Sequence, residues 1–170
     1  MSNNQLKIGL ILSAFVCLLL AADTSYAIES SLPKQGKDLH SITIFRKSNT
    51  KDGTFTKKIS SFKVEVASDE KSRNKGLSVR NELPVGRGML FILDNSENNY
   101  FWMKDMKFSI DVLLFDSKKS VAEIYENLPL CSNCPIIMPK KPVSYALEIN
   151  SGETIKCDIK VGDVFEFTED

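Results

Sequence analysis

Beyond residue 54, apolar and polar residues alternate along much of the chain, which is the pattern of half-buried β-strands. The clearest example has Phe62, Val64 and Val66 separated by charged residues. The Ser-Asp-Glu sequence at residues 68–70 then predicts the start of a helix, because a short polar side chain caps the first turn and an acid favours it. We expect this helix to end near Gly76.

Seven further segments predict short strands, and turn-forming residues separate them. The almost wholly apolar residues 110–115 are expected to be covered on both faces, and the Gly-Asp pair at 162–163 predicts a hairpin turn. A loop is expected at residues 128–142, which are rich in proline. The predicted fold is therefore mainly β, a compact antiparallel barrel- or sandwich-like domain with one or two short helices. The expected strands are residues 62–66, 89–93, 100–103, 110–115, 121–125, 143–149, 154–159 and 164–167.

The start of the chain follows a different pattern. Its apolar run at residues 8–22 is too short to span a bilayer and is typical of a signal peptide, and small residues place the cleavage after Ala27. An uncleaved anchor and a lipoprotein attached at Cys17 are the alternatives. A periplasmic or secreted protein is expected, with no stable membrane insertion after cleavage. The predicted organisation is a signal peptide at 1–27, a linker or loosely docked arm at 28–53, and a single β-rich domain at 54–170.

Charge and histidine content narrow the function classes. Lys plus Arg and Asp plus Glu both number 22, so no net charge favours nucleic acid as a partner. His40 is the only histidine, and it precedes the predicted domain. Ser-His-Asp and Cys-His mechanisms, which need an imidazole beside the nucleophile, are therefore not expected.

Several short motifs occur in the order in which one known family carries them, and together they resemble the domain of unknown function 192 family over about residues 62–167. The resemblance implies a compact, mostly β, often exported domain with no established activity. Ser78 and Asp105 depart from the family pattern, which usually has methionine and asparagine at these positions. The motifs are Val64-Glu65-Val66-Ala67, Arg73, Gly76-Leu77, Arg80, Leu83-Pro84, Gly88-Met89-Leu90-Phe91, Phe101-Trp102-Met103-Lys104, Ile110-Asp111, Phe115, Tyr145-Ala146-Leu147-Glu148 and Lys160-Val161-Gly162-Asp163.

One group of charged and aromatic residues predicts a ligand site. Two arginines seven residues apart can share a helical face, although Gly76 between them can interrupt it, and paired guanidiniums suit a carboxylate, a phosphate or a sugar acid. In a strand, Trp102 and Lys104 share one face, where the indole offers a stacking wall. Alternatively, the arginines pair with Asp111 or Glu148 and brace the fold. The candidate ligand-binding residues are Arg73, Arg80, Trp102, Lys104, Asp105 and Asp111.

The cysteines form a second candidate. Cys131 and Cys134 have a spacing that suits a structural disulfide, a redox pair or half of a metal site. Flanking prolines predict a loop rather than the helix N-terminus that activates a catalytic cysteine, and a zinc site lacks further ligands. A structural disulfide in an oxidising compartment is therefore favoured, and no metal or cofactor is expected. Cys157 fits the alternation of its segment and is expected to be buried.

The sequence thus favours a non-enzymatic accessory or binding domain for a small anionic or sugar-like ligand, or for a protein partner. A thiol-redox protein that uses Cys131 and Cys134 is one alternative. A histidine-independent hydrolase is another, although no pair of acids at a set separation can be recognised. The scattered acids, expected to be solvated or bracing, are Asp111, Asp116, Glu123, Glu126 and Glu148.

Overall fold

The computed structural model describes residues 39–50, 53–93, 99–132 and 134–168 of the 170-residue chain. The expected signal peptide at 1–27, and the expected linker as far as residue 38, lie outside these residues. No helix in the described part is long and apolar enough to cross a membrane.

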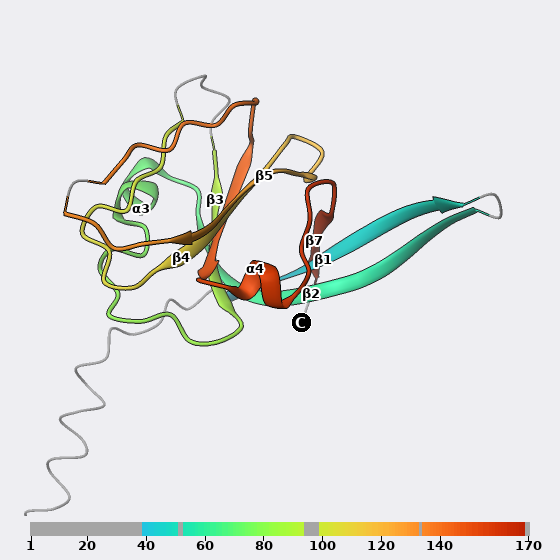
Figure 1. Cartoon of the computed structure of the whole chain (residues 1–170), viewed down its shortest axis with the longest axis horizontal. Helices are drawn as coiled ribbons and strands as arrows, with labels where there is room; N and C mark the ends of the chain where they lie inside the picture. Colours follow the sequence, from blue (N-terminus) through green and yellow to red (C-terminus); the bar gives the residue numbers. More distant parts are fainter. Residues whose placement is uncertain (1–38, 51–52, 94–98, 133, 169–170) are drawn as a thin grey trace, which may run out of the picture. The chain divides into compact units, whose positions relative to one another are not determined.

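Seven strands form one sheet in the order β5-β4-β6-β3-β2-β1-β7 (Figure 1). Neighbouring strands are antiparallel except β2 and β3, which are parallel. The predicted mainly β fold with two short helices is confirmed for the described residues, and its antiparallel character is corrected at that one pair. The elements are β1 Leu39–Thr50, β2 Gly53–Ala67, α3 Glu70–Lys75, β3 Arg87–Ile92, β4 Ile110–Phe115, β5 Val121–Leu128, β6 Tyr145–Asn150, α4 Glu153–Lys156 and β7 Val164–Thr168.

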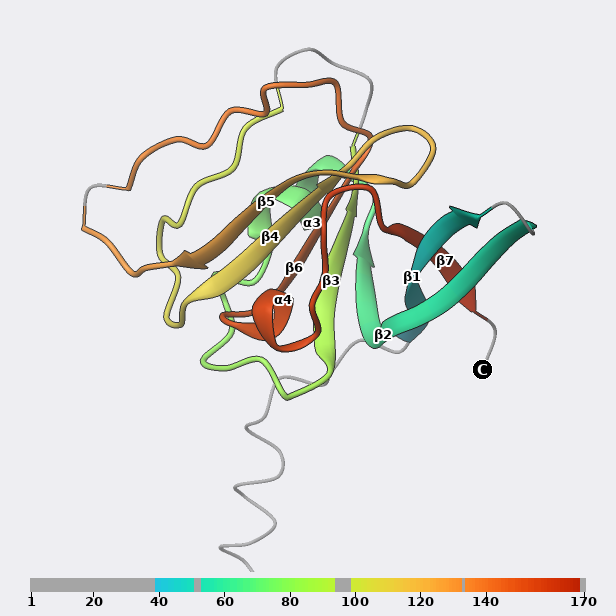
Figure 2. The ribbon, with the colours of Figure 1, turned by 45° about the vertical axis from the view of Figure 1, so that its right-hand side comes forward.

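The sheet bends strongly but does not close into a barrel (Figure 2). Its two edge strands, β5 and β7, come together at their starts, where Ser120, just before β5, forms an isolated bridge with Val164 of β7. Beside this bridge, the Phe165 backbone N–H donates to the Lys119 carbonyl at 3.0 Å. Because only this isolated bridge pairs the two edges in the described residues, the sheet stays open. The sandwich-like alternative of the predicted fold describes the molecule better than a barrel does.

Each face of the central strands carries its own hydrophobic core, because successive side chains of a strand point to opposite faces. The first core includes Ile42, Phe62, Leu113 and Phe165. The second includes Leu77 after α3, and Met103 and Val143 from the long connections. On β4 the alternation sends Leu113 and Phe115 to the first core and Val112 and Leu114 to the second. All six residues of β4 are buried, as expected for residues 110–115.

The expected linker proves to be structural from Leu39 onward. β1 pairs with β2 along its length and with β7 at Ser41 to Phe45, and the side chains of Ile42 and Ile44 are fully buried in the first core. The polar composition of this stretch hid most of the strand, which pairs with β2 directly after it and with β7 near the other end of the chain. The histidine that the sequence placed outside the domain, His40, is exposed on this strand with its ring against Phe167.

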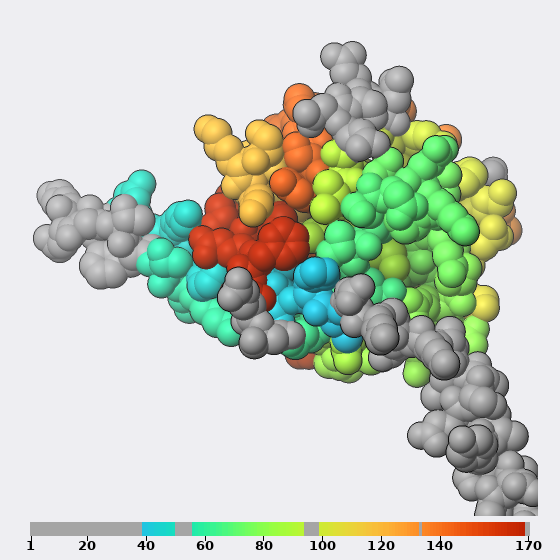
Figure 3. Space-filling model, turned by 180° about the vertical axis from the view of Figure 1, so that it is seen from behind, coloured from blue at the N-terminus to red at the C-terminus, as the bar shows by residue number. Residues whose placement is uncertain are grey.

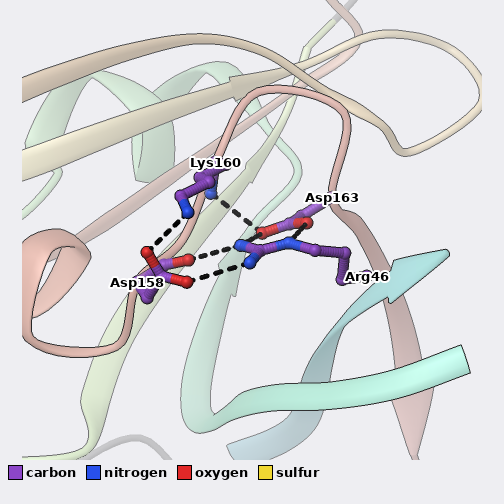
Figure 4. Close-up of polar contacts among 4 residues, drawn as sticks. All are labelled: Arg46, Asp158, Lys160 and Asp163. Atoms are coloured by element: carbon purple, nitrogen blue, oxygen red, sulfur yellow. Dashed lines mark hydrogen bonds and ion pairs between the residues drawn. The ribbon is translucent and has the colours of Figure 1, made fainter. Parts of the chain in front are cut away.

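A charged cluster ties β1 to the segment before β7 (Figure 4). The Arg46 guanidinium donates from Nε and Nη2 to the buried Asp163 carboxylate, both at 2.8 Å, and from Nη1 to Asp158 at 2.9 Å. Asp163 also accepts from the Lys160 backbone N–H at 2.8 Å. These contacts raise the pKa of Arg46 and lower that of Asp158 to about 2 through hydrogen bonds from Lys160 and Arg46.

The local sequence pattern predicts helix α3 but not helix α4. α3 follows the prediction: Asp69 caps it by accepting from the Ser72 backbone N–H at 2.9 Å, and Gly76 ends it at a φ of 48° that a side chain would strain. Residues 154–159, expected as a strand, instead begin inside α4, and Ile155 is 61% exposed. Residues 100–103 are also not a regular strand, since only Phe101 forms a bridge.

Candidate functional site

A pocket of about 450 Å³ lies between α3 with its following turn and the segment of residues 99–106. Its size is within the usual range of small-molecule sites. These two parts of the chain lie side by side on the face shown in Figure 3, where they are coloured green and yellow. The pocket brings together four of the six predicted ligand-binding residues: Arg73, Trp102, Lys104 and Asp105.

The segment of residues 99–106 forms one wall of the pocket. Phe101 exchanges two backbone hydrogen bonds of 2.9 and 2.8 Å with Ile137, which fixes the segment against the loop at 128–142. Trp102 is 49% exposed. The Lys104 Nζ lies 5.1 Å from the centroid of its ring, so these two residues share a side, as predicted. Asp105 adopts a φ of 59°, and this turn brings its side chain to the same pocket rather than to an opposite strand face.

Arg73 forms part of the opposite wall and also holds α3 in place. Its Nη1 donates to the Ser68 carbonyl at 2.9 Å and to the Ile92 carbonyl at 3.2 Å. These bonds tie the helix to the ends of β2 and β3. Arg73 therefore supplies positive charge to the pocket while bracing it, and a substitution there would change both properties.

Glu148, which the sequence suggested only as a solvated or bracing acid, is part of the pocket lining. It is on β6, opposite Met89 of β3 and Val112 of β4, and both of these neighbours are buried apolar residues. No residue in the described ranges donates a hydrogen bond to its carboxyl group or forms an ion pair with it. Burial raises the pKa of Glu148 to about 8, because removal from water disfavours the charged form.

A signal for Glu148 was present in the sequence. It interrupts the otherwise apolar residues 146–149 at a position that alternation places on the same face as buried Ala146. An acid on a buried strand face needs a partner, a neutral state or a ligand. The pattern alone does not say which of the three applies.

Arg80 and Asp111, the other two predicted ligand-binding residues, lie outside this pocket. Arg80 donates from Nη2 to the Glu65 carboxylate on β2, at 2.6 Å to Oε1, so it braces the fold through a partner that the sequence had not suggested. Asp111 is fully buried and accepts three backbone N–H groups, from Asn127, Gly152 and Thr154. Its carboxylate caps the start of α4.

The cysteine loop supports the pocket from outside. The Sγ atoms of Cys131 and Cys134 are 2.14 Å apart, and both residues pack against the second core. The same loop carries Ile137, the bridge partner of Phe101. Cys157 is partly buried against the first core and follows α4 rather than lying on the expected strand. No three His, Cys, Asp or Glu side chains of the described chain are grouped as metal ligands.

Comparison with known proteins identifies the family. Residues 51–167 match the model of the domain of unknown function 192, which is described only as an uncharacterized ACR. This chain belongs to that family. The resemblance drawn from the motifs is thus confirmed, and the family brings no established activity with it. No curated protein matches this chain.

Two solved structures share the fold. A protein of unknown function from Novosphingobium aromaticivorans is 25% identical, with a TM-score of 0.65 over 79% of this chain and 89% of its own. A Sinorhizobium meliloti protein, described as "a putative transcription regulator", is 26% identical, with a TM-score of 0.63 over 79% of this chain and 98% of its own. The domain 192 fold is therefore shared along nearly the whole length of both proteins.

Proposed function

We propose that this family member is a non-enzymatic accessory domain that holds a small anionic or sugar-like ligand in the pocket between α3 and residues 99–106. The observation that carries the proposal is the convergence of Arg73 from α3 with Trp102 and Lys104 from the 99–106 segment around the unpartnered Glu148. An aromatic wall beside a few polar groups is the usual composition of a site for a small polar molecule.

The pocket charges favour an anion or a polar ring. Arg73, Lys75 and Lys104 contribute three positive groups, whereas Asp105 and Glu148 are the acids among the lining residues. The half-exposed indole of Trp102 presents an apolar face on which a sugar ring can stack. A protein partner that inserts an acidic side chain is the alternative occupant.

Nucleic acid is not proposed as a partner, despite the description of the Sinorhizobium protein. The chain has no net positive charge, and phosphate-backbone binding depends on a surplus of Lys and Arg. Export also belongs to the proposal: cleavage after Ala27 would leave a periplasmic or secreted domain, in which Cys131 and Cys134 form a structural disulfide. An intact mass that begins at Ile28, with Cys157 alone open to alkylation, would support this; three alkylated thiols would contradict it.

A redox role for this pair is the less favoured alternative, because the cysteines lie in a loop rather than at the start of a helix. A reduction potential near those of known exchange catalysts would support that role.

The binding proposal can be tested through Trp102, which is the only tryptophan of the chain and therefore reports on the pocket without a label. Its fluorescence would be titrated with D-glucuronate, D-glucose, D-glucosamine and inorganic phosphate at pH 7. We expect saturable quenching by glucuronate and a weakening of at least tenfold on Lys104→Ala. That change removes a positive charge and its contact with the Trp102 ring, but no hydrogen bond or ion pair among the described residues.

Lys118→Ala is the matched control. Lys118 is an exposed lysine in the turn between β4 and β5, outside the pocket, so this variant should bind as the wild type does. Binding that is equal in all three proteins, or no response to any of the four probes, would refute the proposed site.

A further inference from the structure

Glu148 raises a question that the proposed function does not answer, namely what a carboxyl group without a protein partner does inside a ligand pocket. Structural acids elsewhere in this chain have donors: Asp111 has three backbone N–H groups and Asp163 has Arg46 and Lys160. The Glu148 side chain is only partly buried, and its oxygens reach the pocket. A ligand that displaces water from this pocket must therefore itself supply a partner for the carboxyl group.

The surroundings of Glu148 determine its charge state. Its strand neighbours are Met89 and Val112, and the pocket lining from β3 adds Phe91 and no titratable group. The charged and titratable lining groups come from α3, which provides Arg73 and Lys75, and from the 99–106 segment, which provides Tyr100, Lys104 and Asp105. Among the described residues, none of these is within ion-pair or hydrogen-bond reach of the Glu148 carboxyl. At pH 7 the group is therefore mostly neutral, in line with a pKa of about 8.

The chemistry of the lining then narrows the ligand class. A neutral carboxyl donates one hydrogen bond, which matches a carboxylate oxygen of a ligand that itself bears one negative charge. A phosphate dianion would need more donors, but the Arg73 Nη1 already serves two backbone carbonyls. The exposed Trp102 ring adds a surface for a sugar ring, and Lys104 beside it offers a positive charge for the same anion.

We propose that the protonated carboxyl of Glu148 donates a hydrogen bond to the carboxylate of a sugar acid, so that the pocket binds this ligand together with a proton and releases it when Glu148 ionises. This inference rests on the proposed function, and it specifies the class of ligand and the dependence of binding on pH. Ionised Glu148 would repel the bound carboxylate and could no longer donate to it.

The experiment measures the Kd of D-glucuronate by Trp102 fluorescence at pH 6, 7, 8 and 9, with circular dichroism as the check that the protein stays folded. For a pKa near 8, the neutral fraction falls about tenfold between pH 7 and 9, so the wild-type Kd should rise about tenfold over this interval. Glu148→Gln keeps a hydrogen-bond donor that cannot ionise. Its Kd should stay within a few-fold of the wild-type value at pH 7 and should not change up to pH 9.

Three outcomes would overturn the inference. The first is a wild-type Kd for glucuronate that is constant from pH 7 to 9. The second is a rise that is equally large in Glu148→Gln. The third is a Kd of D-glucose that rises as much between pH 7 and 9 as that of glucuronate, which would mean that Glu148 does not contact the ligand carboxylate. Each of these outcomes requires that a probe binds. If no probe changes the Trp102 fluorescence at any pH, the proposed function itself is refuted.

Discussion

Asp111 is fully buried and Glu148 is partly buried. The two acids lie on adjacent strands, one register step apart, yet their surroundings are opposite. Asp111 of β4 lies opposite Ile149, and Glu148 of β6 lies opposite Val112, so alternation directs their side chains to opposite faces of the sheet. Asp111 accepts three backbone N–H groups, whereas Glu148 has no partner among the described residues and faces a pocket.

The difference teaches how to separate a structural acid from a functional one. Three hydrogen bonds to a carboxylate compensate for its burial, and they fix the chain segments that donate them. A carboxyl without such bonds destabilises the fold whenever it is charged. The first arrangement stabilises the fold, and the second is the one to which we assign a ligand, so the two residues should respond to substitution with opposite signs.

The largest effect is expected at Asp111. Asp111→Ala would leave three buried N–H groups without an acceptor, and we expect the free energy of unfolding to fall by ~3–5 kcal/mol. Urea unfolding at pH 7 measures this change. Asp111→Asn keeps one carbonyl acceptor and should lose less. A loss below ~1 kcal/mol in the alanine variant would mean that solvent replaces the carboxylate, and the contrast with Glu148 would fail.

A smaller effect of opposite sign is expected at Glu148. Its pKa is about 8 in the folded protein and 4.5 ordinarily, so between these values the folded state holds a proton that the unfolded chain has released. Stability should therefore fall as pH rises from about 4.5 to 8, with a limiting slope of about 1.4 kcal/mol per pH unit.

Glu148→Gln removes the titrating carboxyl group, so the difference in stability between this variant and the wild type measures its effect. Relative to the wild type, the variant should gain about 1–3 kcal/mol between pH 5 and pH 7, as measured by urea unfolding at each pH. Glu126→Gln, a change at an exposed acid of β5, is the matched control and should show no such gain. Parallel stability curves for wild type and Glu148→Gln would show that the Glu148 carboxyl is hydrated.

The sequence predicted the features that depend on neighbouring residues. The start and end of α3 are predicted from residues 68–70 and Gly76, and the buried character of β4 from its almost wholly apolar run. Hydrogen bonds between residues far apart in the sequence could not be predicted in this way. Residues 154–159 alternate like a strand, but the carboxylate of Asp111, more than forty positions earlier, accepts the N–H groups of Gly152 and Thr154 and caps a helix there.

In the candidate site, too, the features that depend on neighbouring residues were predicted and those that depend on distant contacts were not. The Trp102 and Lys104 pair was found because adjacent residues report on one local conformation, even though the segment is not a regular strand. Asp111 was placed in the site and Glu148 outside it, because an acid between apolar residues looks the same from the sequence whether backbone donors or a cavity surround it. Only the packing of α4 around one and of α3 near the other separates them.

The smallest predicted effect tests a third acid, Asp163, which is buried at 2% exposure and combines a backbone donor with a cation. Arg46→Lys keeps the positive charge but loses the fork that donates from Nε and Nη2, so the unfolding free energy should fall by about 1 kcal/mol. Lys47→Arg, at an exposed position of the same strand, is the control and should change it by less than ~0.5 kcal/mol. If Arg46→Lys costs as much as Asp111→Ala, hydrogen-bond geometry governs buried acids in this fold. If Arg46→Lys leaves the unfolding free energy unchanged, a positive charge and the Lys160 N–H are enough to stabilise the Asp163 carboxylate. Glu148 would then differ from the other two acids simply in lacking any donor.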